Sequence, residues 1–268
     1  MASAILSGIV EGPGSQGRSI HVSEKFEPAR KTIVDRFPDV SVSASPEPAN
    51  TFVLAVKPKD APSAVSELEI LVNTPSGKTA IPPVLVSIAA GIDSAHLSSW
   101  APSFTIVRTM PNTAVAVGKG VVAIAAGKGA DEEVMARAES LFSAVAMTVR
   151  VPEYQMDAVT AMSGSGPAYF MYFIEALEEA GVSLGLPLDL ARKLAILTTV
   201  GSGQLALEDG RDPRILRLEV TSPGGTTARG IAEFDRGALK ATITNAVFAA
   251  YERSKELGKK AARLKRGR

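Results

Sequence analysis

The stretch TFVLAVKP (residues 51–58) decides the fold. Five of its first six residues are apolar, without alternation between apolar and polar residues, and the Lys-Pro pair ends the run. This pattern is typical of a strand that is buried on both faces, as in a parallel sheet covered by helices. We therefore expect a buried strand over residues 51–56 and an α/β protein around it.

Short β-rich runs and helical patterns alternate on both sides of this strand. The further strand candidates are SIHV (19–22), VSV (40–42), VLVSIA (84–89), TIVRTM (105–110), VVAIAA (121–126) and MTVRV (147–151). Apolar residues at helical spacing occur in the opening MASAILSGIVEG, before Gly12-Pro13-Gly14, and over residues 27–36, 61–68 and 131–142. Alternation of this kind predicts a mainly parallel sheet with helices on both faces.

The pattern changes after Pro152, where strand candidates stop. Helices are predicted over residues 157–162, 167–180, 187–208 and 239–257. Pro167 and Pro187 suit first-turn positions, and Gly181 and Gly210 suit helix ends. We therefore expect two domains, residues 1–151 and 152–268. An all-helical second domain rich in apolar surface is expected to complete its core against a second copy of the chain.

Composition excludes several classes of function. The 268 residues carry a net charge of +1, which argues against a nucleic acid as the main partner, and the basic end KKAARLKRGR (259–268) is interpreted as a solvated helix end or tail. The chain has no cysteine and only two histidines, His21 and His96, without an acidic cluster beside either, so a metal site is not expected. No apolar run reaches the ~20 residues of a membrane span, and no signal peptide is visible. We expect a soluble, cytoplasmic protein.

Three stretches at predicted strand ends contain residues suited to binding a ligand. They are AVKP (55–58), IAAG (88–91) and MPN (110–112). Ligands of doubly wound sheets lie outside the carboxyl ends of the strands, where a lysine can meet a phosphate and small residues let a flat ring approach the backbone. Each stretch alone also fits a plain surface turn. Together they predict a crevice for a dinucleotide.

The helical half contains two glycine-rich hydroxyl segments, DAVTAMSGSGPAY (157–169) and TSPGGTT (221–227). The first breaks one helix and opens another at Pro167, and the second forms a tight turn whose Thr226 and Thr227 can open the following helix. Backbone N–H groups left free at such a helix start can bind an anion. The alternative interpretation is that both segments are ordinary turns between helices. Ser163 and Ser165 are not interpreted as nucleophiles, because no histidine base lies near them in the sequence.

These segments, together with VRTMPNTAVAVGKG, LAVKP and SIAAGI, resemble the pyrroline-5-carboxylate reductases, in the same order and over nearly the whole chain. The resemblance implies an N-terminal Rossmann-type domain and a helical dimerisation domain that interlocks with a partner subunit. It also implies reduction of L-Δ1-pyrroline-5-carboxylate to L-proline with NADPH or NADH, the last step of proline biosynthesis. The small-molecule substrate would be the main ligand of a homodimer or a higher homo-oligomer.

The resemblance also implies roles for individual residues. The cofactor would be lined by Ser23, Lys25, Val56, Lys57, Pro58, Ala89, Ala90, Met110, Pro111 and Asn112, with Ser23 and Lys25 near the adenosine ribose or its phosphate. The substrate would meet Glu153, Gly225, Thr226 and Thr227. Thr227 would serve the reaction as hydrogen-bond partner or proton donor to the ring nitrogen. An iminium substrate arrives already protonated, so the absence of strong acids and bases fits this chemistry.

By the same resemblance, MASAILSGIVEG corresponds to the family's first helix, which follows a strand and a glycine-rich G-x-G-x-x turn. The chain begins directly after that turn, so the sequence predicts a truncated start that lacks the first strand and the pyrophosphate-binding glycines. A misplaced start codon is one explanation. A gene fragment with weak or no cofactor binding is the other.

Two further functions are compatible with the sequence. A non-catalytic oligomer of the same fold would keep the helical assembly domain without gripping a cofactor. A related hydroxy-acid dehydrogenase fits less well, because such enzymes place a catalytic lysine or histidine in the helical domain. The candidate Lys193 has no hydroxyl-glycine loop beside it.

Overall fold

A computed structural model describes residues 1–12, 17, 19–79 and 81–263, with side chains to residue 260. Pro13 and Gly14, which were expected to help end the first helix, and the last five residues of the basic tail lie outside the described residues. The chain forms two compact units. One comprises the described residues within 1–165 and 250–268, and the other comprises residues 166–249.

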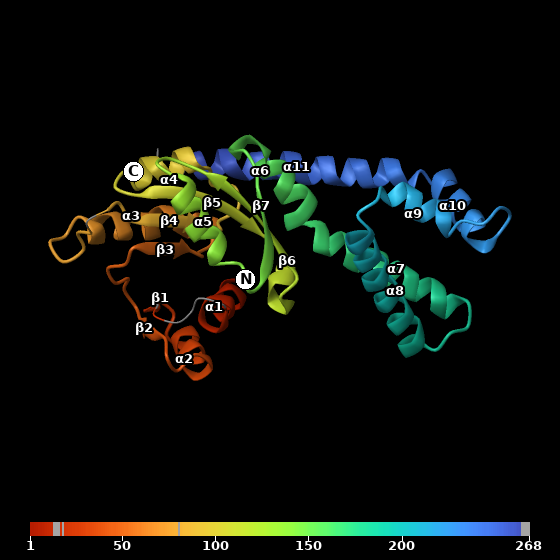
Figure 1. Cartoon of the computed structure of the whole chain (residues 1–268), viewed down its shortest axis with the longest axis horizontal. Coiled ribbons are helices and arrows are strands. Elements are labelled where there is room, and N and C mark those ends of the chain that lie inside the picture. The colour runs from red at the N-terminus through yellow and green to blue at the C-terminus, as the bar shows by residue number, and fades with distance from the viewer. Residues whose placement is uncertain (13–16, 18, 80, 264–268) are drawn as a thin grey trace. The chain divides into compact units, whose positions relative to one another are not determined.

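A five-stranded sheet forms the centre of the first unit (Figure 1). Its strands, in spatial order, are β3 (Thr51–Leu54), β4 (Val84–Ser87), β5 (Thr105–Pro111), β6 (Gly120–Ala126) and β7 (Ala146–Arg150). Neighbouring strands are parallel except for β5 and β6, which are antiparallel. The mainly parallel sheet predicted from the sequence is thus confirmed.

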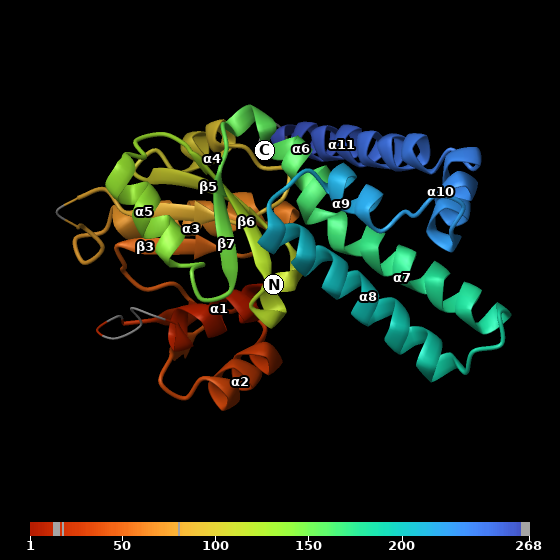
Figure 2. The same ribbon diagram turned by 45° about the vertical axis from the view of Figure 1, so that its right-hand side comes forward.

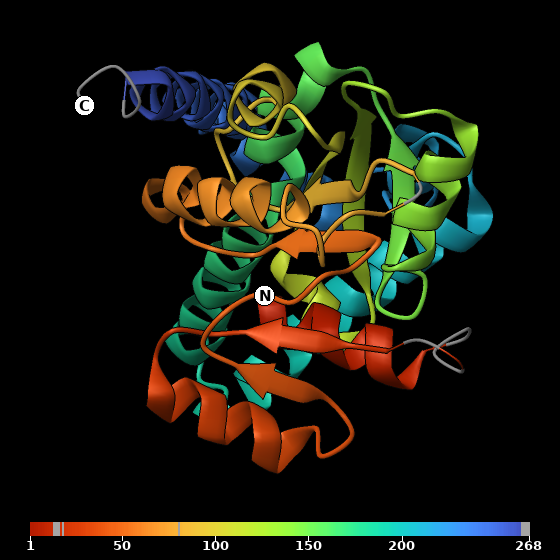
Figure 3. The same cartoon turned by 90° about the vertical axis from the view of Figure 1, so that its left-hand side faces the viewer.

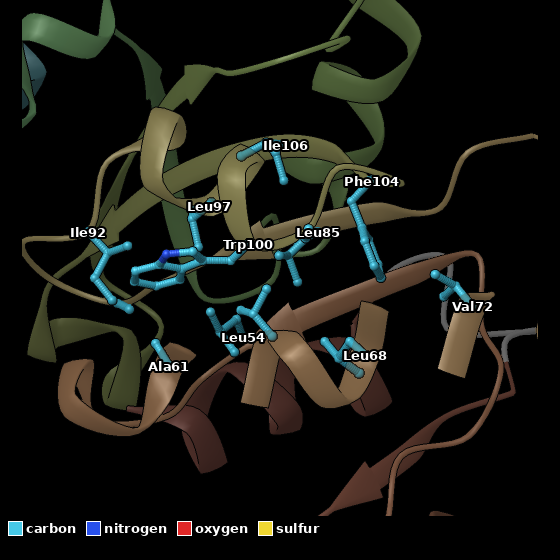
Figure 4. Packing of buried hydrophobic residues seen from close by; sticks show 13 residues of the cluster. Leu54, Ala61, Leu68, Val72, Leu85, Ile92, Leu97, Trp100, Phe104 and Ile106 are labelled. Carbon is cyan, nitrogen blue, oxygen red and sulfur yellow. The ribbon is translucent and has the colours of Figure 1, made fainter. Parts of the chain in front are cut away.

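One face of this sheet is covered by α3 (Ala61–Val72) and α4 (Ser94–Trp100). Figure 4 shows apolar side chains from these helices and from β3 and β4 pointing toward one another. The largest members of this core are Leu54, Leu68, Leu85, Ile92, Leu97, Trp100, Phe104 and Ile106. The helix α4 was not predicted, although Asp93 caps it by accepting a hydrogen bond from the backbone N–H of His96 at 2.8 Å.

The opposite face packs against α1 (Ala2–Glu11) and α5 (Glu132–Ser140), as the apolar cluster shared with β4–β6 shows. Ile5 of α1 is buried in that cluster. Gly8 lets α1 approach closely, because a Cβ at this position would lie 2.5 Å from a methyl group of Val145. The opening helix predicted from the sequence is therefore confirmed as part of the sheet's cover.

A second, two-stranded parallel sheet is formed by β1 (His21–Ser23) and β2 (Ser41–Ser43) (Figure 3). The intervening helix α2 (Glu27–Arg36) has the predicted bounds. Among the described residues, β3 pairs with β4 alone. As an edge strand, β3 is half-buried over residues 51–53, so the interpretation of TFVLAV as a strand buried on both faces was wrong. The strands buried along nearly their whole length are β4 and β5.

The segment that follows β7 still packs against the sheet. Residues 156–164 form α6 (Met156–Val159) and a π-helical turn (Thr160–Gly164), and Met156 is buried against Ala123 and Ala125 of β6. The end of α11 (Leu239–Arg263) also belongs to this unit, where Ser254 donates a hydrogen bond to Asp157 at 2.7 Å. The compact units therefore divide at residue 165, later than the boundary expected from the end of the strands.

The second unit is helical. Its long helices α7 (Gly166–Ser183) and α8 (Leu188–Asp209) pack side by side (Figure 2), and α9 (Pro213–Glu219), α10 (Thr226–Arg236) and the beginning of α11 follow. Gly210 ends α8 with a φ of 70°, as predicted. Gly181 lies inside α7, and Pro187 is the residue before α8, so those two positions were predicted wrongly.

None of the helices that the structure describes is both long and apolar enough to cross a membrane.

Candidate cofactor and substrate site

The residues expected to line a dinucleotide follow the carboxyl ends of parallel strands. Val56, Lys57 and Pro58 come after β3, where a backbone hydrogen bond from Asp60 to the Lys57 carbonyl, 2.9 Å long, closes the turn. The side chains of Val56 and Lys57 are exposed. Because β3, β4 and β5 run parallel, their carboxyl ends lie at one edge of the sheet. Lys57 therefore follows a strand end at the same edge as the ends of β4 and β5.

The end of α11 packs against the loop after β4. Ala89 is buried, and its backbone N–H donates to the Ser87 hydroxyl at 3.3 Å, while Ala90 is half-buried. Gly91 adopts a φ of 75°, and a Cβ on Gly258 of α11 would lie 3.1 Å from the Gly91 carbonyl oxygen. Glycine at both positions thus allows α11 to hold this loop in place.

The end of β5 presents Met110, Pro111 and Asn112. The Asn112 side-chain oxygen accepts hydrogen bonds from the backbone N–H groups of Ala114 at 3.2 Å and Val121 at 3.3 Å, which fixes the orientation of the amide. Its nitrogen then faces the Ser163 hydroxyl at 3.5 Å. The sequence does not predict this juxtaposition of the MPN stretch with the serine-glycine segment.

The π-helical turn makes that juxtaposition possible. A Cβ on Gly164 would lie 2.5 Å from the terminal methyl of Met110, so glycine lets the turn pass β5 without displacing the end of that side chain. The backbone N–H of Ser165 bonds to the Thr160 carbonyl at 2.9 Å, which is the wide ring of a π-helix. Single π-turns inside helices are frequent at functional sites, and this one lies beside two residues predicted to contact the cofactor.

At the end of β1, Ser23 makes a hydrogen bond and Lys25 makes an ion pair with neighbouring segments. The Ser23 hydroxyl donates to the Ala44 carbonyl at 3.4 Å. The Lys25 ammonium lies 2.8 Å from a carboxylate oxygen of Glu67 on α3. This ion pair places the end of β1 against the helix that follows the AVKP turn. The sequence did not single out Glu67 as the partner of Lys25, because its sequence neighbourhood is that of an ordinary solvated helix face.

Glu153, which was expected in the substrate pocket, makes its hydrogen bonds to residues of the first unit. One carboxylate oxygen accepts a hydrogen bond from the Arg108 guanidinium at 2.7 Å and from the backbone N–H of Ser94 at 3.2 Å. The other carboxylate oxygen is buried and has no partner among the described residues. Arg108 is 6% exposed on β5. The signal in the sequence was the lone arginine inside the apolar run TIVRTM.

The TSPGGTT segment lies in the helical unit and opens α10. Gly224 has a φ of 70°, and Gly225 precedes the helix, with its N–H bonded to the Ser222 carbonyl at 3.0 Å. The first helical bond runs from Arg229 to the Gly225 carbonyl, so the amides of Thr226, Thr227 and Ala228 have no helical acceptor. Both threonines are exposed. Three free amides and two hydroxyls at a helix start are suited to binding a carboxylate.

The segment leading to α10 is braced by Arg211. Its guanidinium lies 2.6 Å from Asp209, at the end of α8, and 2.7 Å from Glu219, at the end of α9. The hydrogen bond from Arg211 holds the pKa of the Asp209 carboxyl below its usual range. Arg211 therefore ties the two helix ends together just before the TSPGGTT segment.

Across the residues that the structure describes, no group of three or more histidine, cysteine, aspartate or glutamate side chains is arranged to hold a metal ion.

Comparison with known proteins gives consistent results. A family model described as pyrroline-5-carboxylate reductase dimerisation matches residues 153–257. A pyrroline-5-carboxylate reductase of Synechocystis is 40% identical over 264 residues, covering 97% of this chain and 96% of that protein. One from Arabidopsis thaliana is 38% identical and covers 96% of this chain and 92% of its own length.

Solved structures agree with these sequence matches. A pyrroline-5-carboxylate reductase from Coxiella burnetii superimposes with a TM-score of 0.85 at 32% identity, over 96% of this chain and 94% of that one. The Plasmodium falciparum pyrroline carboxylate reductase with NADP bound gives a TM-score of 0.77 at 29% identity, over 96% of each chain.

Proposed function

The chain belongs to the pyrroline-5-carboxylate reductase family, and we propose that it carries out that reaction with the residues described above. The reaction converts L-Δ1-pyrroline-5-carboxylate to L-proline, the last step of proline biosynthesis. NADPH or NADH supplies the hydride when it is bound. The observation that carries the proposal is the 40% identity to a reductase over 97% of the chain.

The donor groups at the ends of β1 and β3 fit a dinucleotide. Lys57 and Lys25 offer cations for phosphate groups, and the Ser23 hydroxyl suits a ribose. Small side chains at Ala89 and Ala90 leave room for a flat ring near the backbone. We assign these residues to the cofactor, with Val56 and Pro58 of the AVKP turn and with Met110, Pro111 and Asn112 on the nicotinamide side.

The start of α10 supplies the groups for the substrate. The free amides at Thr226 and Thr227 favour a carboxylate through the partial positive charge of the helix start, and Gly225 lets the backbone come close to it. The Thr227 hydroxyl serves as hydrogen-bond partner or proton donor to the ring nitrogen. Glu153 stays assigned to the substrate side as a prediction, with Arg108 as the residue that holds its carboxylate.

These assignments divide the chain into a dinucleotide-binding part, residues 1–151, and a substrate-binding and dimerisation part, residues 152–268. The match of the dimerisation family model to residues 153–257 supports the second part. A cytoplasmic location stays a prediction from the sequence.

The purified 268-residue chain tests the proposal directly. We expect NADPH or NADH oxidation that depends on pyrroline-5-carboxylate, and quenching or enhancement of dinucleotide fluorescence on binding. A folded oligomer that binds neither dinucleotide and turns over no substrate would favour the non-catalytic alternative.

Assembly through the helical unit is proposed from its exposed apolar side chains. Four apolar residues recur at helical spacing on α8 and form an exposed stripe: Leu190, Leu194, Leu197 and Val200. Ala191 and Ala195 of the same helix are buried. Apolar stripes of this kind mark interaction surfaces. The matching family model describes a dimerisation region, so a second copy of the chain is the occupant that we propose.

We expect Leu197→Glu to convert the oligomer to a monomer, because a charge would be buried without a partner in the interface. Sedimentation velocity measures the change in mass. Ser202→Glu, at an exposed position about 120° around the helix from Leu190, is the matched control and should leave the oligomer intact. Unchanged mass in the Leu197 variant would place the interface elsewhere.

A further inference from the structure

The segment after β1 is held rigidly by its neighbours. The Arg30 guanidinium of α2 donates to the carbonyl oxygens of Glu24 and Lys25, each at 2.8 Å. The Glu24 carboxylate accepts a hydrogen bond from the backbone N–H of Phe26, also at 2.8 Å. The backbone is thereby fixed, and the Glu24 side chain is turned toward it. Lys25 is left as the cation that extends from this segment.

The Lys25 side chain has an acidic partner on another element. Its ammonium lies 2.8 Å from Glu67 of α3, and the two side chains are 69% and 35% exposed. Both groups are reachable from solvent, so the pair can open for a ligand. The Glu67 carboxylate, however, competes with any other anion for the same ammonium group.

NADPH and NADH differ by one phosphate group on the adenosine ribose. That phosphate is attracted by the Lys25 ammonium and repelled by the Glu67 carboxylate, whereas the ribose hydroxyl of NADH is uncharged and can donate a hydrogen bond to a carboxylate. We propose that Glu67 is a specificity-determining residue that lowers the preference for NADPH over NADH by occupying Lys25. This inference rests on the proposed function, because it requires Ser23 and Lys25 to receive the ribose.

The test measures dinucleotide dissociation constants by fluorescence titration of the full chain. Glu67→Gln should tighten NADPH binding about two- to fivefold, the range expected from removing an exposed ion pair, and should not tighten NADH binding. The effect should shrink as the salt concentration rises. Glu27→Gln is the matched control, since it removes the same charge from an exposed pair with Lys31 on α2, and it should leave the NADPH-to-NADH ratio unchanged.

A double-mutant cycle shows whether the effect passes through Lys25. In a Lys25→Met background, Glu67→Gln should shift the NADPH-to-NADH ratio far less than it does in the parent chain. The inference would be overturned if Glu67→Gln left the NADPH-to-NADH ratio unchanged, or if it shifted the ratio equally in the Lys25→Met background. If the parent chain still bound a dinucleotide in that case, the proposed function would stand. Binding of neither dinucleotide by the parent chain would overturn both.

Discussion

Replacing Thr227 by valine should lower kcat/KM for pyrroline-5-carboxylate about 10²–10³-fold, the usual cost of losing one oriented hydrogen-bond donor at a reacting centre. Valine keeps the size and branching of threonine but has no hydroxyl group. The free amides at the start of α10 stay in place, so the substrate carboxylate keeps its binding groups. The loss is therefore expected mainly in kcat, with a smaller change in KM.

Two measurements make this result specific. Thr227→Ser restores the hydroxyl and should recover most of the rate, because the helix start is unchanged. The NADPH dissociation constant of Thr227→Val should equal that of the parent chain, since this residue is assigned to the substrate. A valine variant with parental kcat would remove Thr227 from the reaction.

Replacing Arg108 by methionine should lower the free energy of unfolding by about 3 kcal/mol, the lower end of the range for breaking a buried ion pair. Arg108 is buried in the central strand β5, and Glu153 is partly buried. Without the arginine, the Glu153 carboxylate would keep only the Ser94 amide as a partner. Partial exposure of Glu153 to water moderates the loss. Urea unfolding followed by circular dichroism measures it.

A second variant distinguishes the stability lost through an unpaired buried charge from the stability lost through poorer packing. Arg108→Met combined with Glu153→Gln removes the unpaired charge and should recover part of the lost stability. Arg137→Met breaks an exposed pair with Glu133 and should cost no more than about 1 kcal/mol. If Arg108→Met costs no more than Arg137→Met, the buried pair does not stabilise the first unit.

The sheet was predictable because its signals are local. Each of the seven strands that the structure describes lies within a few residues of an apolar or β-branched run, and α2 has the predicted bounds. The two missed helices, α4 and α9, are each seven residues long. Asp93 and Asp212 cap them, so the capping residues were visible in the sequence, but the apolar periodicity was too short to use.

The candidate site was predictable where it follows a general rule. Ligands of parallel sheets lie beyond the carboxyl ends of the strands, and this rule places Lys57 and Asn112 at one edge of the sheet because each follows a strand predicted to be parallel. The rule does not predict which side chain faces which. It therefore missed Glu67 beside Lys25, and Ser163 beside Asn112.

The sequence by itself determined the strands, the helical second half and the family resemblance, because apolar periodicity and short motifs act over a few residues. Tertiary structure alone decided that β3 is an edge strand among the described residues, and that Arg108 pairs with Glu153, 45 residues away in the chain. It also decided that the π-helical turn meets Met110. The order and register of the strands fix such contacts, and no local pattern of residues specifies either.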